Sequence, residues 1–126
     1  MVNLLGLGEM EQRHKKGEDP FDLAIEKWMR IKDFLLEKAD PERYKEAYQC
    51  GLSKVIFCLD YKSYCHLCPL SSACLNHESL YYQIMRHLHV YSLVGTLLPL
   101  GPVIELIEKY IIDMRSYRQD WLKRSQ

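Results

Sequence analysis

The sequence lacks a net charge, a long uninterrupted apolar run and a recognisable export signal. Seventeen Lys and Arg residues balance seventeen Asp and Glu residues, so no overall field attracts the chain to nucleic acid or to an anionic membrane. The longest apolar stretch, residues 90–104, is short for a membrane span and is broken by Pro99 and Pro102. The N-terminal residues carry mixed charge instead of the basic and apolar regions of a secretory signal. We therefore expect a cytoplasmic protein without a membrane segment, in which thiols are reduced.

Motifs of the common enzyme classes are also missing. The sequence has no glycine-rich nucleotide loop, no Ser–His–Asp arrangement and no paired carboxylates. The apolar fraction of 48% and the charged fraction of 27% are ordinary for a folded globular chain and argue against general disorder. A length of 126 residues predicts one domain over 1–126, with 1–18 forming either a short helix or a mobile arm.

Helix signals dominate, and no alternation typical of strands competes with them, so the sequence predicts an all-α fold. Asp19-Pro20 and Asp40-Pro41 each provide an N-cap followed by proline at the first helical position. The first of these helices is expected to end near Ala39. Its apolar face contains Ala24, Ile25, Trp28, Ile31 and Leu35, and the charged residues Glu26, Lys27, Lys32 and Asp33 lie mostly elsewhere.

We predict a small bundle of about four helices with a cysteine-rich loop between the second and the third. The second helix is expected to begin at Pro41 and to run into Cys58, and the third to begin at Asn76 or His77. Pro102 is well placed to open the fourth. That helix repeats apolar residues at steps of four and three: Val103, Ile107, Tyr110, Met114, Tyr117 and Trp121. Such a seam is typical of core packing and also of a homodimer contact through the C-terminal helix.

Four of the five cysteines lie in one segment, CLDYKSYCHLCPLSSAC, over residues 58–74. Cys58, Cys65, Cys68 and Cys74 follow the spacing C-x6-C-x2-C-x5-C. Thiolates are soft ligands that suit iron–sulfur clusters and zinc, and four can complete the coordination of either. Zinc ribbons usually present two C-x2-C pairs, whereas this segment has one pair with longer arms that favour a bulkier group. We predict a [4Fe–4S] cluster, with zinc as the alternative, and expect Cys50 to be a buried structural thiol.

The cysteine spacing resembles the iron–sulfur cluster loop of the endonuclease III and adenine DNA glycosylase family in all three gaps. CHLCPLSSAC is particularly similar to the adenine glycosylase form, and the resemblance covers residues 45–76, roughly. It implies that all four cysteines ligate one [4Fe–4S] cluster and that the loop lies near DNA. The helix-hairpin-helix and the catalytic aspartate of that family have no counterpart before Cys58. We therefore expect no base excision.

Several residues near the loop and at the C-terminus are candidates for supporting roles. His66 could donate a hydrogen bond to a cluster sulfur, and Tyr64 is expected beside the cluster without ligating it. Nucleic-acid contacts are predicted at Lys54, Lys62, Arg115, Arg118, Lys123 and Arg124. Because Asp60 offsets Lys62 within the loop, we expect such binding to be weak and independent of sequence.

Three functions stay open at this level. The first is an iron–sulfur protein that serves as a non-catalytic module for nucleic-acid-linked or protein interactions. The second is an electron-transfer or redox-sensing protein whose cluster itself reacts. The third is an interaction domain stapled by zinc.

Overall fold

The computed structural model describes residues 2–60, 64, 66, 68–94 and 99–124. All regular secondary structure within these ranges is helical, which confirms the predicted all-α class, and no described helix is long and apolar enough to cross a membrane. The helices found there are α1 (Leu7–Lys15), α2 (Pro20–Glu37), α3 (Pro41–Leu52), α4 (Ile56–Asp60), α5 (Ser71–Cys74), α6 (Leu80–Val94) and α7 (Gly101–Arg124).

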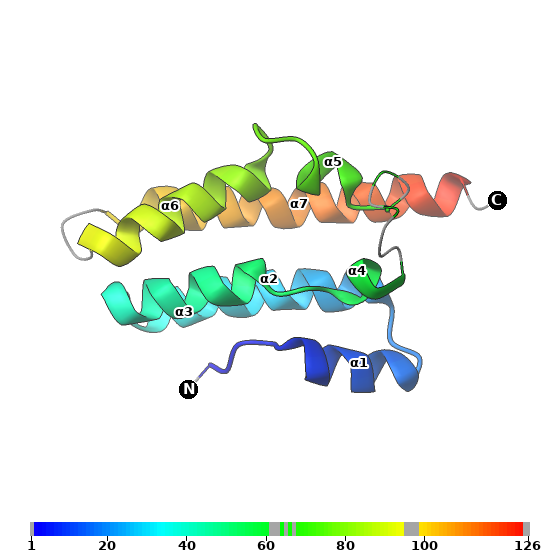
Figure 1. Ribbon diagram of the computed structural model, residues 1–126, viewed down its shortest axis with the longest axis horizontal. Coiled ribbons are helices and arrows are strands. Elements are labelled where there is room, and N and C mark those ends of the chain that lie inside the picture. Colours follow the sequence, from blue (N-terminus) through cyan, green and yellow to red (C-terminus); the bar gives the residue numbers. More distant parts are fainter. Residues whose placement is uncertain (1, 61–63, 65, 67, 95–98, 125–126) are drawn as a thin grey trace.

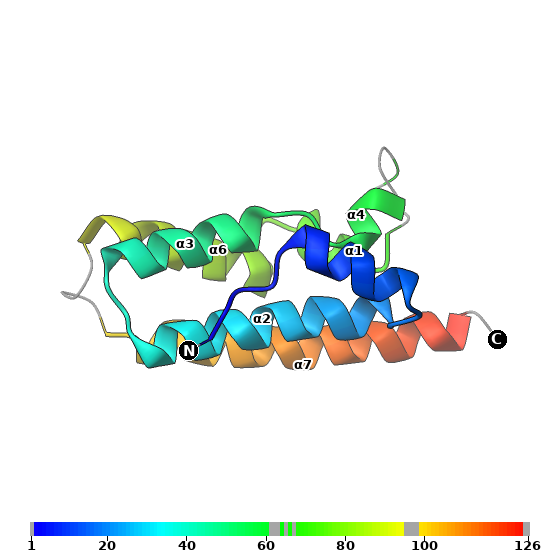
Figure 2. The same ribbon diagram turned by 90° about the horizontal axis from the view of Figure 1, so that it is seen from below.

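The four long helices α2, α3, α6 and α7 form an antiparallel bundle. Figure 1 shows α6 and α7 in one layer above α2 and α3, and Figure 2 shows α3 over α6 and α2 over α7. Along the chain, each of these four long helices runs opposite to the one before it (Figure 1). The short helices α4 and α5 lie toward the end of the bundle where α7 ends, and α1 packs along the outside of α2 and α4.

The starts of α2 and α3 lie where the sequence predicts them. Asp19 caps α2 by accepting a hydrogen bond from the Phe21 amide at 2.7 Å, and Asp40 caps α3 by accepting one from the Arg43 amide at 2.9 Å. Each aspartate precedes a proline at the first position of the helix. Proline is tolerated there because the N–H that it lacks would have no partner within the helix. Helix α2 ends at Glu37, close to the predicted Ala39.

The prediction that the second bundle helix runs into Cys58 is wrong. Helix α3 ends at Leu52, and α4 begins separately at Ile56. The Ser53 hydroxyl donates to the Cys50 carbonyl at 2.6 Å, and the Ser53 backbone is extended. Such a side-chain bond competes with the helical ladder, and it turns the chain here.

Within the N-terminal segment, Leu7–Lys15 form helix α1, which packs on the bundle. Leu5 and Met10 are fully buried against the bundle. Arg13 on α1 bonds to both carboxylate oxygens of Glu18 at 2.6 and 2.7 Å and to Glu26 on α2 at 2.6 and 2.9 Å. These bonds and the two apolar contacts fasten α1 to the outside of α2.

The second half of the chain begins its helices near the expected positions. Helix α6 begins at Leu80, after the predicted Asn76 or His77, because the Asn76 side chain accepts from the Glu78 amide at 3.0 Å and forms a turn first. Helix α7 begins at Gly101. Most of the predicted α7 seam is buried inside the chain itself: Val103, Ile107, Tyr110 and Met114. The seam therefore packs the core of the bundle, and a homodimer stays a prediction.

Candidate metal centre

Two short helices hold the first and the last of the four clustered cysteines. Cys58 lies on α4, and its amide donates to the Val55 carbonyl at 3.0 Å. Cys74 is the last residue of α5, and the Tyr82 hydroxyl donates to its carbonyl at 2.8 Å. The Ser79 hydroxyl similarly holds the carbonyl of Ala73 at 2.7 Å. The start of α6 thus fixes the end of α5 and the backbone of Cys74.

A cavity of about 100 Å³ lies between these two helices and the bundle. Cys58 and Cys74 both line it, together with residues from α2, α3, α6 and α7. A single water needs roughly 10–15 Å³ of such space, so the cavity is large enough for a group bigger than one water or one ion. The structure therefore brings two of the four predicted ligands to the wall of one cavity.

Lys27 on α2 lines the same cavity and is almost completely buried, with 1% of its surface exposed. Its Nζ donates to the carbonyl oxygen of Ser53 at 2.9 Å. The sequence interpretation placed Lys27 among the charges that lie mostly off the apolar face of this helix, and for Lys27 that is wrong. Lys27 follows Ala24 by three residues and precedes Ile31 by four, so it belongs to the apolar stripe of α2. This spacing is the signal that could have identified it.

Lys27 is buried without a carboxylate partner among the described residues. Burial lowers the pKa of Lys27, and negative charge on the Cys50, Cys58 and Cys74 thiols acts in the opposite direction. No described carboxylate forms an ion pair with its ammonium group. Cys58 and Cys74 line the same cavity as this lysine, and negative charge on them would favour its charged form.

Aromatic side chains form much of the remaining wall. Trp28 and Tyr110 meet edge to face with ring centroids 5.3 Å apart, and Tyr81 lies beside both. The Tyr81 hydroxyl donates to the Gly51 carbonyl at 3.3 Å. Burial, with a smaller contribution from charge on Cys74, raises the pKa of Tyr81 to about 12. The phenol thus stays neutral at ordinary pH, and the rings shield the inner side of the cavity from water.

A third predicted ligand, Cys68, does not line this cavity. Cys68 lines a second hollow of about 70 Å³ with Tyr117 and Trp121 of α7, and its Sγ accepts from the Leu70 amide at 3.4 Å. Cys65 lies outside the described residues. No three His, Cys, Asp or Glu side chains gather as a metal site in the ranges that the structure covers. The complete four-thiolate set stays a prediction.

The remaining residues predicted near the loop lie at its surface or behind it. Tyr64 and His66 are exposed, with ring centroids 6.4 Å apart. Cys50 is half-buried on α3, where its thiol lies 3.8 Å from the Leu5 carbonyl oxygen, and burial raises its pKa. Cys50 therefore has the surroundings of a structural thiol and does not line the cavity.

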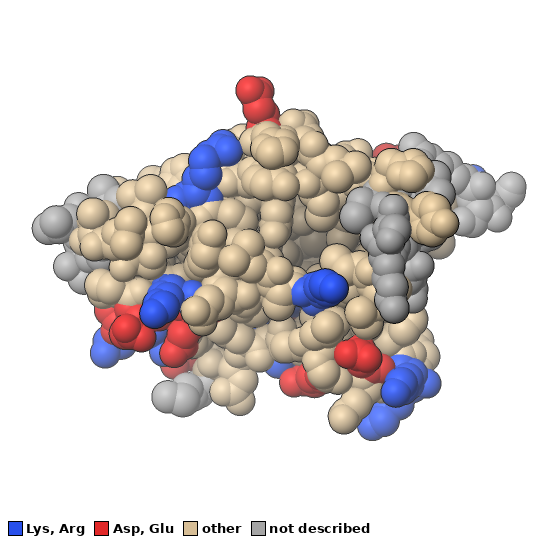
Figure 3. Space-filling model, in the orientation of Figure 1, with Lys and Arg blue, Asp and Glu red and all other residues tan. Residues whose placement is uncertain are grey.

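The predicted nucleic-acid contacts are scattered. Lys54 is exposed at the cavity rim, and Lys123 is exposed on α7. Lys62 and the Arg124 side chain lie outside the description. The face in Figure 3 is mostly uncharged; many of its basic and acidic side chains lie near one another along the lower edge, and single charged side chains lie nearer the centre and the top. Among the described residues, the face shown has no continuous basic surface.

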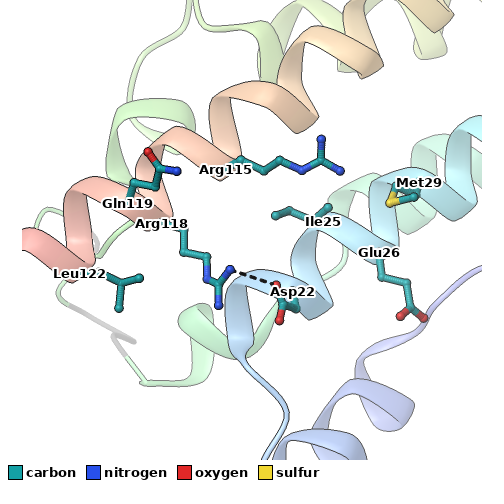
Figure 4. Close-up of a pocket in the computed structure, with 8 residues that line it drawn as sticks. All are labelled: Asp22, Ile25, Glu26, Met29, Arg115, Arg118, Gln119 and Leu122. Carbon is teal, nitrogen blue, oxygen red and sulfur yellow. Dashed lines mark ion pairs between the residues drawn. The ribbon is translucent and has the colours of Figure 1, made fainter.

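Arg115 and Arg118 line a separate groove of about 630 Å³ between α2 and α7. Figure 4 shows Arg118 extending toward Asp22, with which it forms an ion pair at 3.7 Å. Glu26 lines the same groove, so a phosphate placed there would meet two carboxylates as well as two guanidinium groups. The charge of this groove is mixed, which does not favour an extended polyanion.

The chemistry of the cavity wall fits an anionic metal–thiolate group. It combines two soft sulfur ligands, a buried cation and aromatic walls, and the described carboxylates stay outside it. Comparison of the chain with protein-family models, with curated proteins and with solved structures finds no match.

Proposed function

We propose that this protein binds one [4Fe–4S] cluster through Cys58, Cys65, Cys68 and Cys74. The observation that carries the proposal is that Cys58 and Cys74, at opposite ends of the cysteine segment, line one cavity beside the buried Lys27. The spacing C-x6-C-x2-C-x5-C and its resemblance to the glycosylase cluster loop support the same group. Cys65 and Cys68 would complete the ligand set.

The size and walls of the cavity favour a cluster over a single zinc ion. A structural zinc needs four ligands close around one ion, whereas this cavity of about 100 Å³ is bounded by residues from four long helices. The cluster, when bound, supplies either a covalent cross-link or a site that takes up one electron. The chain binds it with thiolates and excludes water with Trp28, Tyr81 and Tyr110.

The biological role that we propose is a non-catalytic module for protein interactions or for weak nucleic-acid contact. The resemblance to the glycosylases is confined to the loop, and the sequence before Cys58 has no counterpart of their catalytic aspartate. Electron transfer or redox sensing by the cluster is the alternative function, and both roles fit a cytoplasmic protein.

Reconstitution with iron and sulfide under anaerobic conditions tests the proposal. We expect a brown protein with broad visible absorption and about four iron and four sulfide per chain. A colourless protein that holds one tightly bound zinc and rejects iron would replace the cluster with zinc. A protein that binds neither would contradict the proposal.

The midpoint potential of the reconstituted protein then separates the two roles. An interaction module needs no accessible redox couple, whereas an electron carrier must be reduced and reoxidised reversibly at potentials that ordinary biological reductants reach. We expect the cluster to resist reduction by mild reductants. Rapid, reversible reduction would favour electron transfer.

A further inference from the structure

Lys27 is a charged residue whose position the packing of the bundle does not explain. It occupies the apolar stripe of α2 with 1% exposure, where a leucine or methionine would fill similar space. An ammonium ion loses its hydration on burial, and this loss is costly unless an opposite charge compensates it. No described carboxylate supplies that charge.

The hydrogen bond to Ser53 accounts for only part of the compensation. The carbonyl of Ser53 follows the C-terminal end of α3, where a cation is favourable, and it accepts one of the three ammonium protons at 2.9 Å. The rest of the ammonium group lies at the wall of a cavity lined by Cys58 and Cys74. An anionic group bound there through these two thiols would supply negative charge directly beside the ammonium group.

An iron–sulfur cluster held by four cysteines provides such a charge. The four thiolates together outweigh the positive charge of the cluster core, so the bound centre is an anion. Reduction adds one further negative charge. A fixed cation beside the cavity would stabilise the bound centre, and it would stabilise the reduced form more than the oxidised form.

We propose that Lys27 is the built-in counter-cation of the metal–thiolate centre, which retains the centre in the cavity and raises its reduction potential. This inference rests on the proposed function, because it concerns the same cavity. Lys27 acts through charge at the wall and is a positioning residue, not a ligand.

Three substitutions at this position and one control separate charge from packing. Lys27→Met removes the charge and keeps an unbranched apolar chain. Lys27→Gln removes the charge and keeps a donor for the Ser53 carbonyl, while Lys27→Arg keeps both. Lys54→Met is the matched control, because Lys54 lines the same cavity but is exposed, where water and salt screen its charge.

The measurements use the full chain, reconstituted anaerobically, with an electrode supplying the single electron. We expect Lys27→Met and Lys27→Gln to shift the midpoint potential to more negative values and to lose iron faster to a chelator. Lys27→Arg and Lys54→Met should stay close to the parent. Equal potentials and equal iron loss in the parent, Lys27→Met and Lys54→Met would overturn the inference while leaving the cluster itself in place.

Unfolding of the metal-free proteins keeps the test decisive if a neutral variant folds poorly. If Lys27 serves the metal centre, its buried charge lowers the stability of the metal-free protein. We therefore expect at least one neutral variant to match or exceed the parent in metal-free thermal stability. If both neutral variants unfold at lower temperature than the parent without metal while Lys27→Arg does not, the charge serves the fold and the inference fails.

A parent that binds no cluster contradicts the proposed function instead. If it binds zinc, the same variants are compared by zinc affinity.

Discussion

The Nη2 atom of Arg118 lies 3.0 Å from Oδ2 of Asp19, which joins the last helix to the residue that caps α2. Asp19 accepts from the Phe21 amide with its other oxygen, so one carboxylate both starts α2 and holds α7. This ion pair is partly exposed, and its own contribution to stability is small. The ion pair has a larger effect on nucleic-acid binding, because it engages the guanidinium group of Arg118, which the sequence predicts as a nucleic-acid contact.

We expect weak, sequence-independent binding of DNA at low salt, with little contribution from Arg118. Each neutralised phosphate contributes about −0.9 to the log–log slope of affinity against salt, so a few exposed cations give a total of about −2 to −4. Anisotropy titrations of the cluster-loaded protein measure this slope. Arg115→Ala should weaken binding more than Arg118→Ala, because Arg118 is already engaged by Asp19.

Two results would contradict this reading of the surface. A slope near −8 would require about nine phosphate contacts, far more than the described cations provide. No binding at low salt would favour a protein partner or a redox role. Base excision should be undetectable in either case.

Replacement of single cysteines should separate ligands from the structural thiol. Because metal affinity for a site absent from the unfolded chain becomes folding free energy, Cys68→Ser should lose the cluster, disorder residues 58–76 and lower the thermal midpoint. Cys50→Ser should keep its full iron content, since Cys50 does not line the cavity. Iron analysis and thermal unfolding of the two variants provide the comparison. Loss of iron in Cys50→Ser would show that the ligand assignment is wrong.

Gly51→Ala should destabilise the bundle by about 1 kcal/mol. A Cβ at this position would lie 2.7 Å from Sδ of Met85 and 3.2 Å from Cη2 of Trp28, and overpacking of this kind costs about 1–3 kcal/mol. The helix gains about 0.5–1 kcal/mol from losing a glycine, which offsets part of the cost. Denaturant unfolding measures the difference.

Gly8→Ala is the matched control for that substitution. Gly8 lies within α1 and has no atom within 4 Å of an added Cβ, so alanine there should stabilise by about 0.5–1 kcal/mol. In a Met85→Ala background the cost of Gly51→Ala should shrink, because the flexible side chain that it meets has been removed. An unchanged cost would place the steric conflict at Trp28 alone.

The docking of α1 should weaken in acid. The hydrogen bond from Arg13 holds the pKa of Glu26 below its ordinary value. A carboxyl group whose pKa is lower in the folded state stabilises fully above its unfolded pKa of about 4.3, and this contribution is lost as the pH falls through the folded pKa. The methyl resonance of Met10, which lies on α1 and is buried, should report detachment as the pH is lowered below that value.

Glu26→Gln should reduce the acid dependence of α1 docking and weaken docking at neutral pH. The matched control is Glu46→Gln at an exposed position on α3, which should leave the Met10 resonance unchanged. The same acid transition in both variants would show that another group releases α1.

The sequence by itself determined where α2 and α3 begin and which residues of α7 face the core. Asp19-Pro20 and Asp40-Pro41 act through bonds within a few residues, and the α7 seam depends only on helical periodicity. Such signals are local, so they can be identified without knowing what the helix packs against. The four-cysteine spacing is equally local, and for that reason it predicts a ligand set without placing the thiols in space.

Only the tertiary structure decided that Lys27 is buried, that α3 stops at Leu52 and that Cys58 and Cys74 face one cavity. The helical stripe allowed Lys27 to lie inside, but its burial depends on the Ser53 carbonyl, 26 residues further along the chain. The cavity is bounded by four long helices as well as the cysteine segment. Its shape and charge arise from residues that meet only when the bundle closes, and no periodicity within one segment encodes such a meeting.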